Sequence, residues 1–206
     1  MMRRLYLILL VAFFPSIVAA ADMDVGQVIV GTDDVLRGHF IEERHLKGFN
    51  GRMSSEGHFV VAPKHGLIWG LEKPFPTTTI ITPAGLVQSI NGVNVMHLPS
   101  QKIPFMLHLY DTLGGALTGN WEALQADFLV TRSGDAKSWQ VTLVPRQTDN
   151  PAMPFASISI SGHRFVENVA MLKPDGDSDT LTFLNESVSS GPPTAVESRA
   201  FNSVPP

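Results

Sequence analysis

The chain has 206 residues, of which 44% are hydrophobic, contains no cysteine and carries a formal net charge of −4. The chain is mildly acidic and has no runs of basic residues, which argues against electrostatic binding to nucleic acid or to anionic lipid. Because it contains no cysteine, it forms no disulfide bonds. A chain of this length buries a hydrophobic core without such bonds, so we expect one ordinary domain.

The first 20 residues have the layout of a secretory signal peptide. Arginines at positions 3 and 4 precede an apolar run over residues 5–14, and small residues follow at the positions that signal peptidase reads, with cleavage after Ala20 or Ala21. The run is too short to span a bilayer comfortably. We therefore expect residues 1–20 to be removed and residues 21–206 to form a single domain, whose 13 basic and 19 acidic residues give a net charge of −6.

Short segments with alternating apolar and polar residues recur along the rest of the chain. The clearest is 157–161, in which two isoleucines face one side and three serines the other. Residues 139–143 alternate in the same way, and residues 180–183 repeat the pattern. Alternation with period two is typical of strands that are buried on one face, so the sequence predicts a mainly β fold.

Two pairs of these segments are predicted to form antiparallel hairpins. Asn91-Gly92 suits a type I′ turn because both central residues need a positive φ, so residues 86–90 and 93–98 form the first predicted pair. Gly57–Ala62 and Gly66–Leu71 form the second, joined through a proline-containing turn. The predicted strands are therefore neighbours of one antiparallel sheet.

Helical spacing interrupts the strands in one region. Apolar residues recur every fourth position from Phe105 to Leu117, which predicts a helical insertion over about 104–125. Thr194 and Glu197 have the spacing of a capping box, which predicts a short helix up to Phe201, followed by a flexible tail from about 202. One sheet that curves around helices leaves a concave interior, which is filled by side chains or by a ligand.

Motifs for catalysis or metal binding are missing from the sequence. It contains no Gly-x-Ser-x-Gly, no His-Glu-x-x-His and no glycine-rich phosphate loop. The turn Asp175–Asp179 resembles a calcium loop in part, but Thr180 occupies the place of the required glycine. We expect no catalytic residue, no metal and no cofactor, so the protein is predicted not to be an enzyme; the alternative is a hydrolase of lipid-linked substrates that uses His108 near Asp111.

The order of several motifs resembles the LolA/LolB-like family of periplasmic lipoprotein carriers. Leu36–Glu43 is similar to the family's opening strand, and Gly57 and Trp69 stand at the family's spacing in the next two. Ile80–Gly85 resembles the apolar strand and turn that follow, and Phe105–Leu124 resembles the helical insertion. The resemblance implies an incomplete, unclosed antiparallel β-barrel that is covered by a helical lid over a hydrophobic cavity.

The same resemblance implies a function and its partners. A family member of this kind is a monomeric periplasmic carrier that takes acyl chains of lipoproteins, or other lipids, from an inner-membrane export complex and passes them to an outer-membrane receptor. No cysteine follows the signal peptide, so the chain is similar to the soluble carrier and not to the lipid-anchored receptor. Strand alternation, together with the apolar stripe of the predicted helix, predicts an apolar cavity on this fold, lined by Phe40, Phe59, Val61, Leu67, Trp69, Ile80, Leu86, Val95, Phe105, Leu109, Phe128, Val141, Leu143, Ile158 and Ile160.

One position departs from the family pattern. The carriers have a functional arginine on the strand before the tryptophan, and counting back from Trp69 places Pro63 there, next to Lys64. A lysine lacks the planar fork with which an arginine bonds several carbonyls at once. The sequence therefore leaves three alternatives open: a divergent branch with glycolipid or polyene cargo, a periplasmic accessory binding module without a carrier role, and a structural or partner-binding module.

Overall fold

The computed structural model describes residues 30–102, 123–135, 137–146 and 155–205. Eleven strands form one antiparallel sheet in the order β6-β5-β4-β3-β2-β1-β11-β10-β9-β8-β7. The strands are β1 (Asp34–His45), β2 (Arg52–Ala62), β3 (Gly66–Lys73), β4 (Thr77–Thr82), β5 (Gly85–Ile90), β6 (Val93–Pro99), β7 (Phe128–Asp135), β8 (Ser138–Pro145), β9 (Ser157–Gly162), β10 (Val166–Leu172) and β11 (Ser178–Ser190). Because β6 and β7 stand at opposite edges and do not pair within the described residues, the barrel is unclosed, as predicted.

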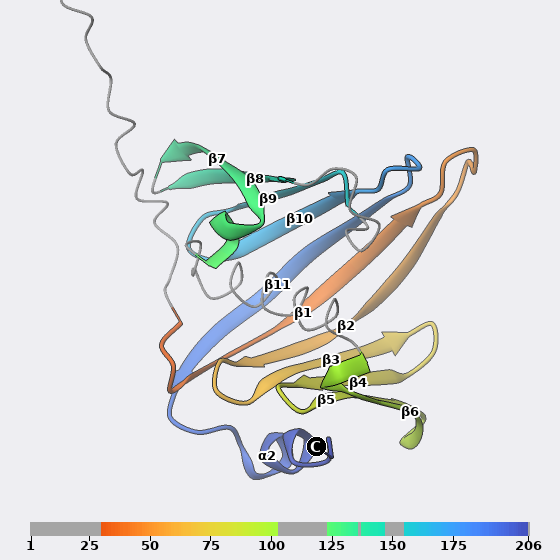
Figure 1. The fold of residues 1–206 in the computed structure, drawn as a ribbon, viewed down its shortest axis with the longest axis vertical. Coiled ribbons are helices and arrows are strands. Elements are labelled where there is room, and N and C mark those ends of the chain that lie inside the picture. The colour runs from red at the N-terminus through yellow and green to blue at the C-terminus, as the bar shows by residue number, and fades with distance from the viewer. Residues whose placement is uncertain (1–29, 103–122, 136, 147–154, 206) are drawn as a thin grey trace, which may run out of the picture.

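The first and last strands meet in the middle of the sheet. β1 pairs with β11 from Asp34↔Ser190 to His45↔Ser178, and every other neighbour in the sheet is also a neighbour in sequence. Figure 1 shows the two long central strands crossing the sheet, with the β3–β6 half on one side and the β7–β10 half on the other. Sequential antiparallel pairs need only short turns, which explains why alternation along the chain predicted the sheet so well.

Both predicted hairpins are confirmed. β5 pairs with β6 around Asn91 and Gly92, whose φ angles of 50° and 79° are both positive, as a type I′ turn requires. β2 pairs with β3 from Glu56↔Lys73 to Ala62↔Gly66, across the turn that contains Pro63. Tight turns of this kind fix the register of each pair, and register decides which side chains share a face.

The sheet buries apolar side chains on both faces. The larger set, here the inner-face cluster, draws members from β1 to β5 and from β7 to β11, including Phe40, Leu86 and Val141. Only a strongly curved sheet brings residues from both halves into one cluster, and Figure 1 shows this curvature. The smaller set, the outer-face cluster, consists of Val35, Val60, Ala62, Ile68, Ile80, Val87, Phe201 and Val204.

The terminal helix α2 (Ala195–Phe201) covers the outer face. It contacts β3 and β4, and Figure 1 places it outside the curve of the sheet. The predicted capping box is present, since Thr194 accepts from the Glu197 N–H while the Glu197 carboxylate accepts from the Thr194 N–H. Arg37 donates to both Glu197 oxygens at 2.7 Å. Val204 is buried beside Phe201, so the tail that was predicted to be flexible from about 202 is packed as far as Val204.

The predicted helical insertion is described only at its end. Residues 123–126 form a 3-10 helix, η2 (Ala123–Ala126), whose Leu124 belongs to the inner-face cluster. Residues 104–122, like the predicted signal peptide 1–20, lie outside the described residues. Among the residues that are described, the longest helix has seven residues, against about 20 for a bilayer-spanning helix.

Candidate functional site

Four aromatic side chains from adjacent strands meet on the inner face. Trp69 of β3 stacks on Phe40 of β1 with ring centroids 3.8 Å apart. Phe59 of β2 and Phe183 of β11 pack around this pair, with centroids 5.2 Å from each other and 6.2–6.3 Å from Trp69. The three phenylalanines are buried, whereas Trp69 is only partly buried. Trp69 is therefore the member of this aromatic group with surface left for a ligand.

Most of the predicted cavity residues are brought together on this face. Trp69 packs against the inner-face cluster, and ten further candidates are buried members of it. These ten are Phe40, Phe59, Val61, Leu67, Leu86, Phe128, Val141, Leu143, Ile158 and Ile160. The alternation of the strands thus predicted a common apolar face correctly at these positions.

Two candidates lie elsewhere, and the strand positions explain why. Ile80 belongs to the outer-face cluster, because the register Ile80↔Ile68 and Ile81↔Leu67 turns Ile81 inward instead. Val95 is 53% exposed on β6, an edge strand that has a sheet neighbour on one side only. The remaining candidates, Phe105 and Leu109, lie outside the described residues, as does His108.

A groove lies over the end of β1, the start of β2 and the end of β3. It has a volume of about 510 Å³ and is lined by Glu42, Arg44, Met53, Ser54, Ser55, Leu71 and Pro74, here called the rim groove. This volume lies within the range of about 300–1,000 Å³ that is typical of small-molecule sites. Leu71 also packs against the inner-face cluster. Apolar and polar groups thus line one groove, which suits a ligand with both kinds of surface.

Charged side chains at the rim groove bond to one another. Arg44 donates to Asp179 at 2.8 Å and to Glu42 at 3.3 Å, and Lys173 lies 2.9 Å from the other Asp179 oxygen. Burial raises the pKa of Glu42, against the opposing charge of Arg44. Asp179, part of the turn that resembles a calcium loop, is thus held by two cations.

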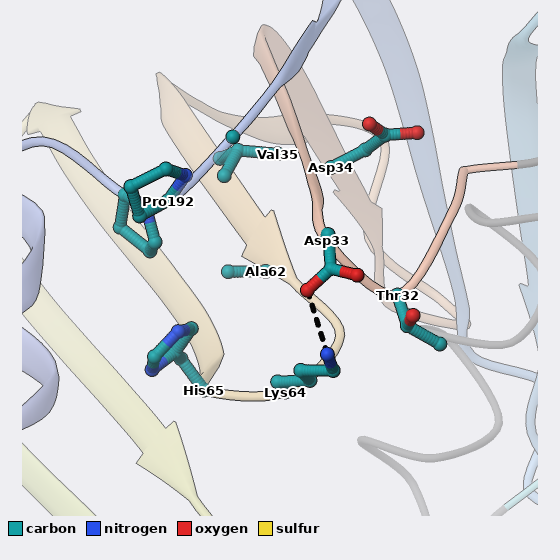
Figure 2. A pocket seen from close by; sticks show the side chains of 10 residues that line it. Thr32, Asp33, Asp34, Val35, Ala62, Lys64, His65 and Pro192 are labelled. Atoms are coloured by element: carbon teal, nitrogen blue, oxygen red, sulfur yellow. Dashed lines mark hydrogen bonds and ion pairs between the residues drawn. The ribbon is translucent and has the colours of Figure 1, made fainter.

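Lys64 does not reach the inner face. It stands in the turn between β2 and β3 and binds Asp33 at 2.6 Å, as Figure 2 shows. The hydrogen bond and the charge of Lys64 lower the pKa of Asp33. The hollow beside this pair measures about 160 Å³ and includes Val35 and Ala62 of the outer-face cluster. Lys64 therefore ties the residue before β1 to the turn between β2 and β3.

Sequence reasoning missed Glu186, which also lies on the inner face. Its Oε1 atom is buried without a hydrogen-bond partner among the described residues, and burial raises the pKa of its carboxyl group. The residue lies in a β-bulge of the pair β1–β11, where the register shifts between Arg37 and His39. The sequence gives no sign of the bulge, and simple alternation from Phe183 would turn Glu186 outward.

No family model and no curated protein matches the chain. Among solved structures, it is similar to a LolA superfamily protein from Nitrosomonas europaea, at 7% identity and a TM-score of 0.43 over 82% of this chain and 91% of that one. It is also similar to a DUF1329 family protein from Desulfovibrio piger, at 5% identity and a TM-score of 0.38 over 84% and 92%.

A third similar structure is the MucA/MucB complex of Pseudomonas aeruginosa, at 12% identity and a TM-score of 0.38, where the match covers 79% of this chain and 55% of that one. The LolA-like resemblance that the sequence motifs predicted is thus found again among solved structures. At these identities and TM-scores, it is a likeness in fold alone and supports nothing further about the chain.

Proposed function

We propose that the protein binds the acyl chains of lipoproteins or of another lipid along its inner face and carries them across the periplasm. The observation that carries the proposal is Trp69, which stacks on Phe40 at 3.8 Å, keeps part of its surface exposed and lies two residues along β3 from Leu71 of the rim groove. Apolar contact at Trp69 and polar groups at Arg44 match the two ends of an amphiphile.

The energetics of transfer suit such a face. An acyl chain gains about 0.8 kcal/mol for each CH₂ group that leaves water, so a carrier needs an apolar surface that approaches this gain without exceeding the affinity of the acceptor. The partly buried apolar residues that pack against the inner-face cluster, Trp69 and Leu71 among them, supply the exposed part of that surface. The proposed role is one of binding.

The route follows from the family resemblance. Residues 1–20 direct export and are removed from the exported chain, which acts as a monomer, receives its cargo from an inner-membrane export complex and delivers it to an outer-membrane receptor. An aromatic inner face does not distinguish one acyl chain from another. The second form of the proposal is therefore that the protein carries a glycolipid or a polyene lipid instead of a lipoprotein. Lys64, held by Asp33 in a turn, favours this second form because the inner-face contacts of the family's arginine have no counterpart there.

Displacement of a fluorescent fatty acid from the purified mature protein tests the proposal. Trp69→Ala removes the exposed aromatic surface and is expected to weaken binding at least tenfold, since burial of a large apolar side chain against a ligand contributes roughly 1.5–3 kcal/mol. Val95→Ala is the matched control, because it truncates an apolar residue that is exposed on β6, away from the inner-face cluster. Equal affinity in the wild type, the Trp69 variant and the control would count against the inner face, and the absence of displacement in all three would remove the proposal.

A further inference from the structure

The position of Glu186 depends on a bulge at the centre of the sheet. His39 pairs with Leu184 and Arg37 with Ser187, so two residues of β11, Asn185 and Glu186, stand opposite Gly38 alone. Asn185 adopts a left-handed conformation with φ of 56°, which is uncommon for a residue other than glycine. A bulge shifts the alternation of its strand and re-aims the following side chains. After this bulge Glu186 faces inward, between Phe183 and Val188, which both pack in the inner-face cluster.

Gly38 leaves room for the Glu186 side chain. A Cβ atom at Gly38 would lie 2.6 Å from the Phe59 ring and 3.2 Å from Cγ of Glu186. The Phe59 ring and the Glu186 side chain therefore both lie over the glycine, on the inner face of β1. The Glu186 side chain thus lies on the same face as the four aromatic rings of the candidate site.

One oxygen of this carboxyl group has no partner in the part of the chain that the structure describes. Oε1 of Glu186 is buried and accepts no hydrogen bond from those residues. Arg37 of β1 pairs with Ser187, the residue after Glu186. Its side chain lies on the outer face, where it donates to Glu197 and Ser189. Burial raises the pKa of Glu186, and the negative charge of Glu167 raises it further. A buried acceptor without a partner destabilises the folded protein, and a charged one does so more strongly. Such an acceptor on the proposed ligand-binding face points to a donor that arrives with the ligand.

We propose that Glu186 is the polar anchor of the lipid site and that its Oε1 atom accepts a hydrogen bond from a hydroxyl or amide N–H group next to an acyl chain. The inference rests on the proposed function and narrows its ligand class to amphiphiles that carry a hydrogen-bond donor at the head of the chain. Chains with an ester at that position have no donor to offer and leave Oε1 without a partner.

Two probes of equal chain length test this directly. N-methyl tetradecanamide carries one N–H donor and methyl tetradecanoate carries none, and both compete with the same fluorescent fatty acid for the mature protein. The measured quantity is the preference, which is the Kd of the ester divided by the Kd of the amide. Hydrogen bonds to charged groups contribute about 1.5–3 kcal/mol, so loss of the anchor lowers the preference by at least about tenfold.

Three variants complete the design. Glu186→Met keeps the approximate length of the side chain without an acceptor, and it should lower the preference at least about tenfold while the ester still binds, which also shows that the variant is folded. Glu186→Gln keeps a neutral acceptor oxygen and should retain part of the preference. Glu43→Met is the matched control, since Glu43 pairs with the exposed Arg52, and it should leave the preference unchanged.

The possible results separate the two proposals. An unchanged preference in Glu186→Met, with both probes bound, would overturn the anchor and leave lipid binding standing. The same loss of preference in Glu43→Met would also overturn it, because the effect would then belong to charge in general. Failure of the wild-type protein to bind either probe would overturn the proposed function and the anchor together.

Discussion

Ile80 and Ile81 form a matched pair that tests which face of the sheet binds ligand. They are neighbours in β4, each is 7% exposed, and they belong to the outer-face and inner-face clusters respectively. Truncation of either to alanine removes three carbon atoms, which at about 0.8 kcal/mol each amounts to about 2.4 kcal/mol before any cavity term. With that term, we expect a loss of about 2–5 kcal/mol in unfolding free energy for both variants.

Ligand binding is expected to separate the two variants. Urea unfolding measures the stability loss, and displacement of a fluorescent fatty acid, at a temperature where both variants are folded, measures affinity. Ile81→Ala should weaken binding severalfold because it removes apolar surface from the inner face, whereas Ile80→Ala should leave the affinity within twofold of the wild type. An equal loss of affinity in both variants, or a loss in Ile80→Ala alone, would refute the assignment of the inner face as the binding face.

Two further predictions concern stability. Hydrogen bonds from Arg37 lower the pKa of Glu197 from 4.5 to about 2, so the pair stabilises the folded state fully above pH 4.5, and this contribution is lost as the pH falls toward 2. Glu197→Gln should therefore lower the unfolding free energy by about 1–2 kcal/mol at pH 7, after allowance for solvent screening, and by almost nothing at pH 2, whereas an equal loss at both values would contradict the assignment. A Cβ atom at Gly57 would lie 1.9 Å from the backbone oxygen of Gly70, so Gly57→Ala should lower the Tm clearly. Gly51→Ala, where a Cβ atom meets nothing within 4 Å, is its control, and similar Tm values for the two would show that the close approach is not as described.

The sequence predicted best where local chemistry decides the structure. Asn91-Gly92 allows positive φ angles at two successive residues, and the turn forms there. The capping box of Thr194 and Glu197 also lies within one helical turn, and both of its hydrogen bonds are present. In β8 the strict alternation from Trp139 to Leu143 places every second residue in the core. In each case the determining contacts lie within a few residues, so no knowledge of the fold is needed.

Prediction failed where distant strands decide the outcome. Two isoleucines in succession, Ile80 and Ile81, carry no alternation, and only pairing with β3 selects the one that faces inward. The segment with Val95 does alternate, but its place at the edge of the sheet leaves it exposed. Glu186 depends on a bulge against β1, and Arg44 finds Asp179 at a distance of 135 residues along the chain. The positions of Glu186 and Arg44 are set only when β1 and β11 pair, so period and spacing alone do not reveal them.

Lipid extraction and mass spectrometry of the exported protein test the central claim most directly. The mature chain is purified from the periplasm of a Gram-negative host without added lipid, beside Trp69→Ala as the matched variant. The account predicts that acyl lipids copurify with the wild-type protein in a near-stoichiometric amount, that they carry a hydroxyl or amide donor next to the chain, and that Trp69→Ala retains far less. Absence of bound lipid from the wild-type protein, with no uptake when lipid is supplied, would contradict it.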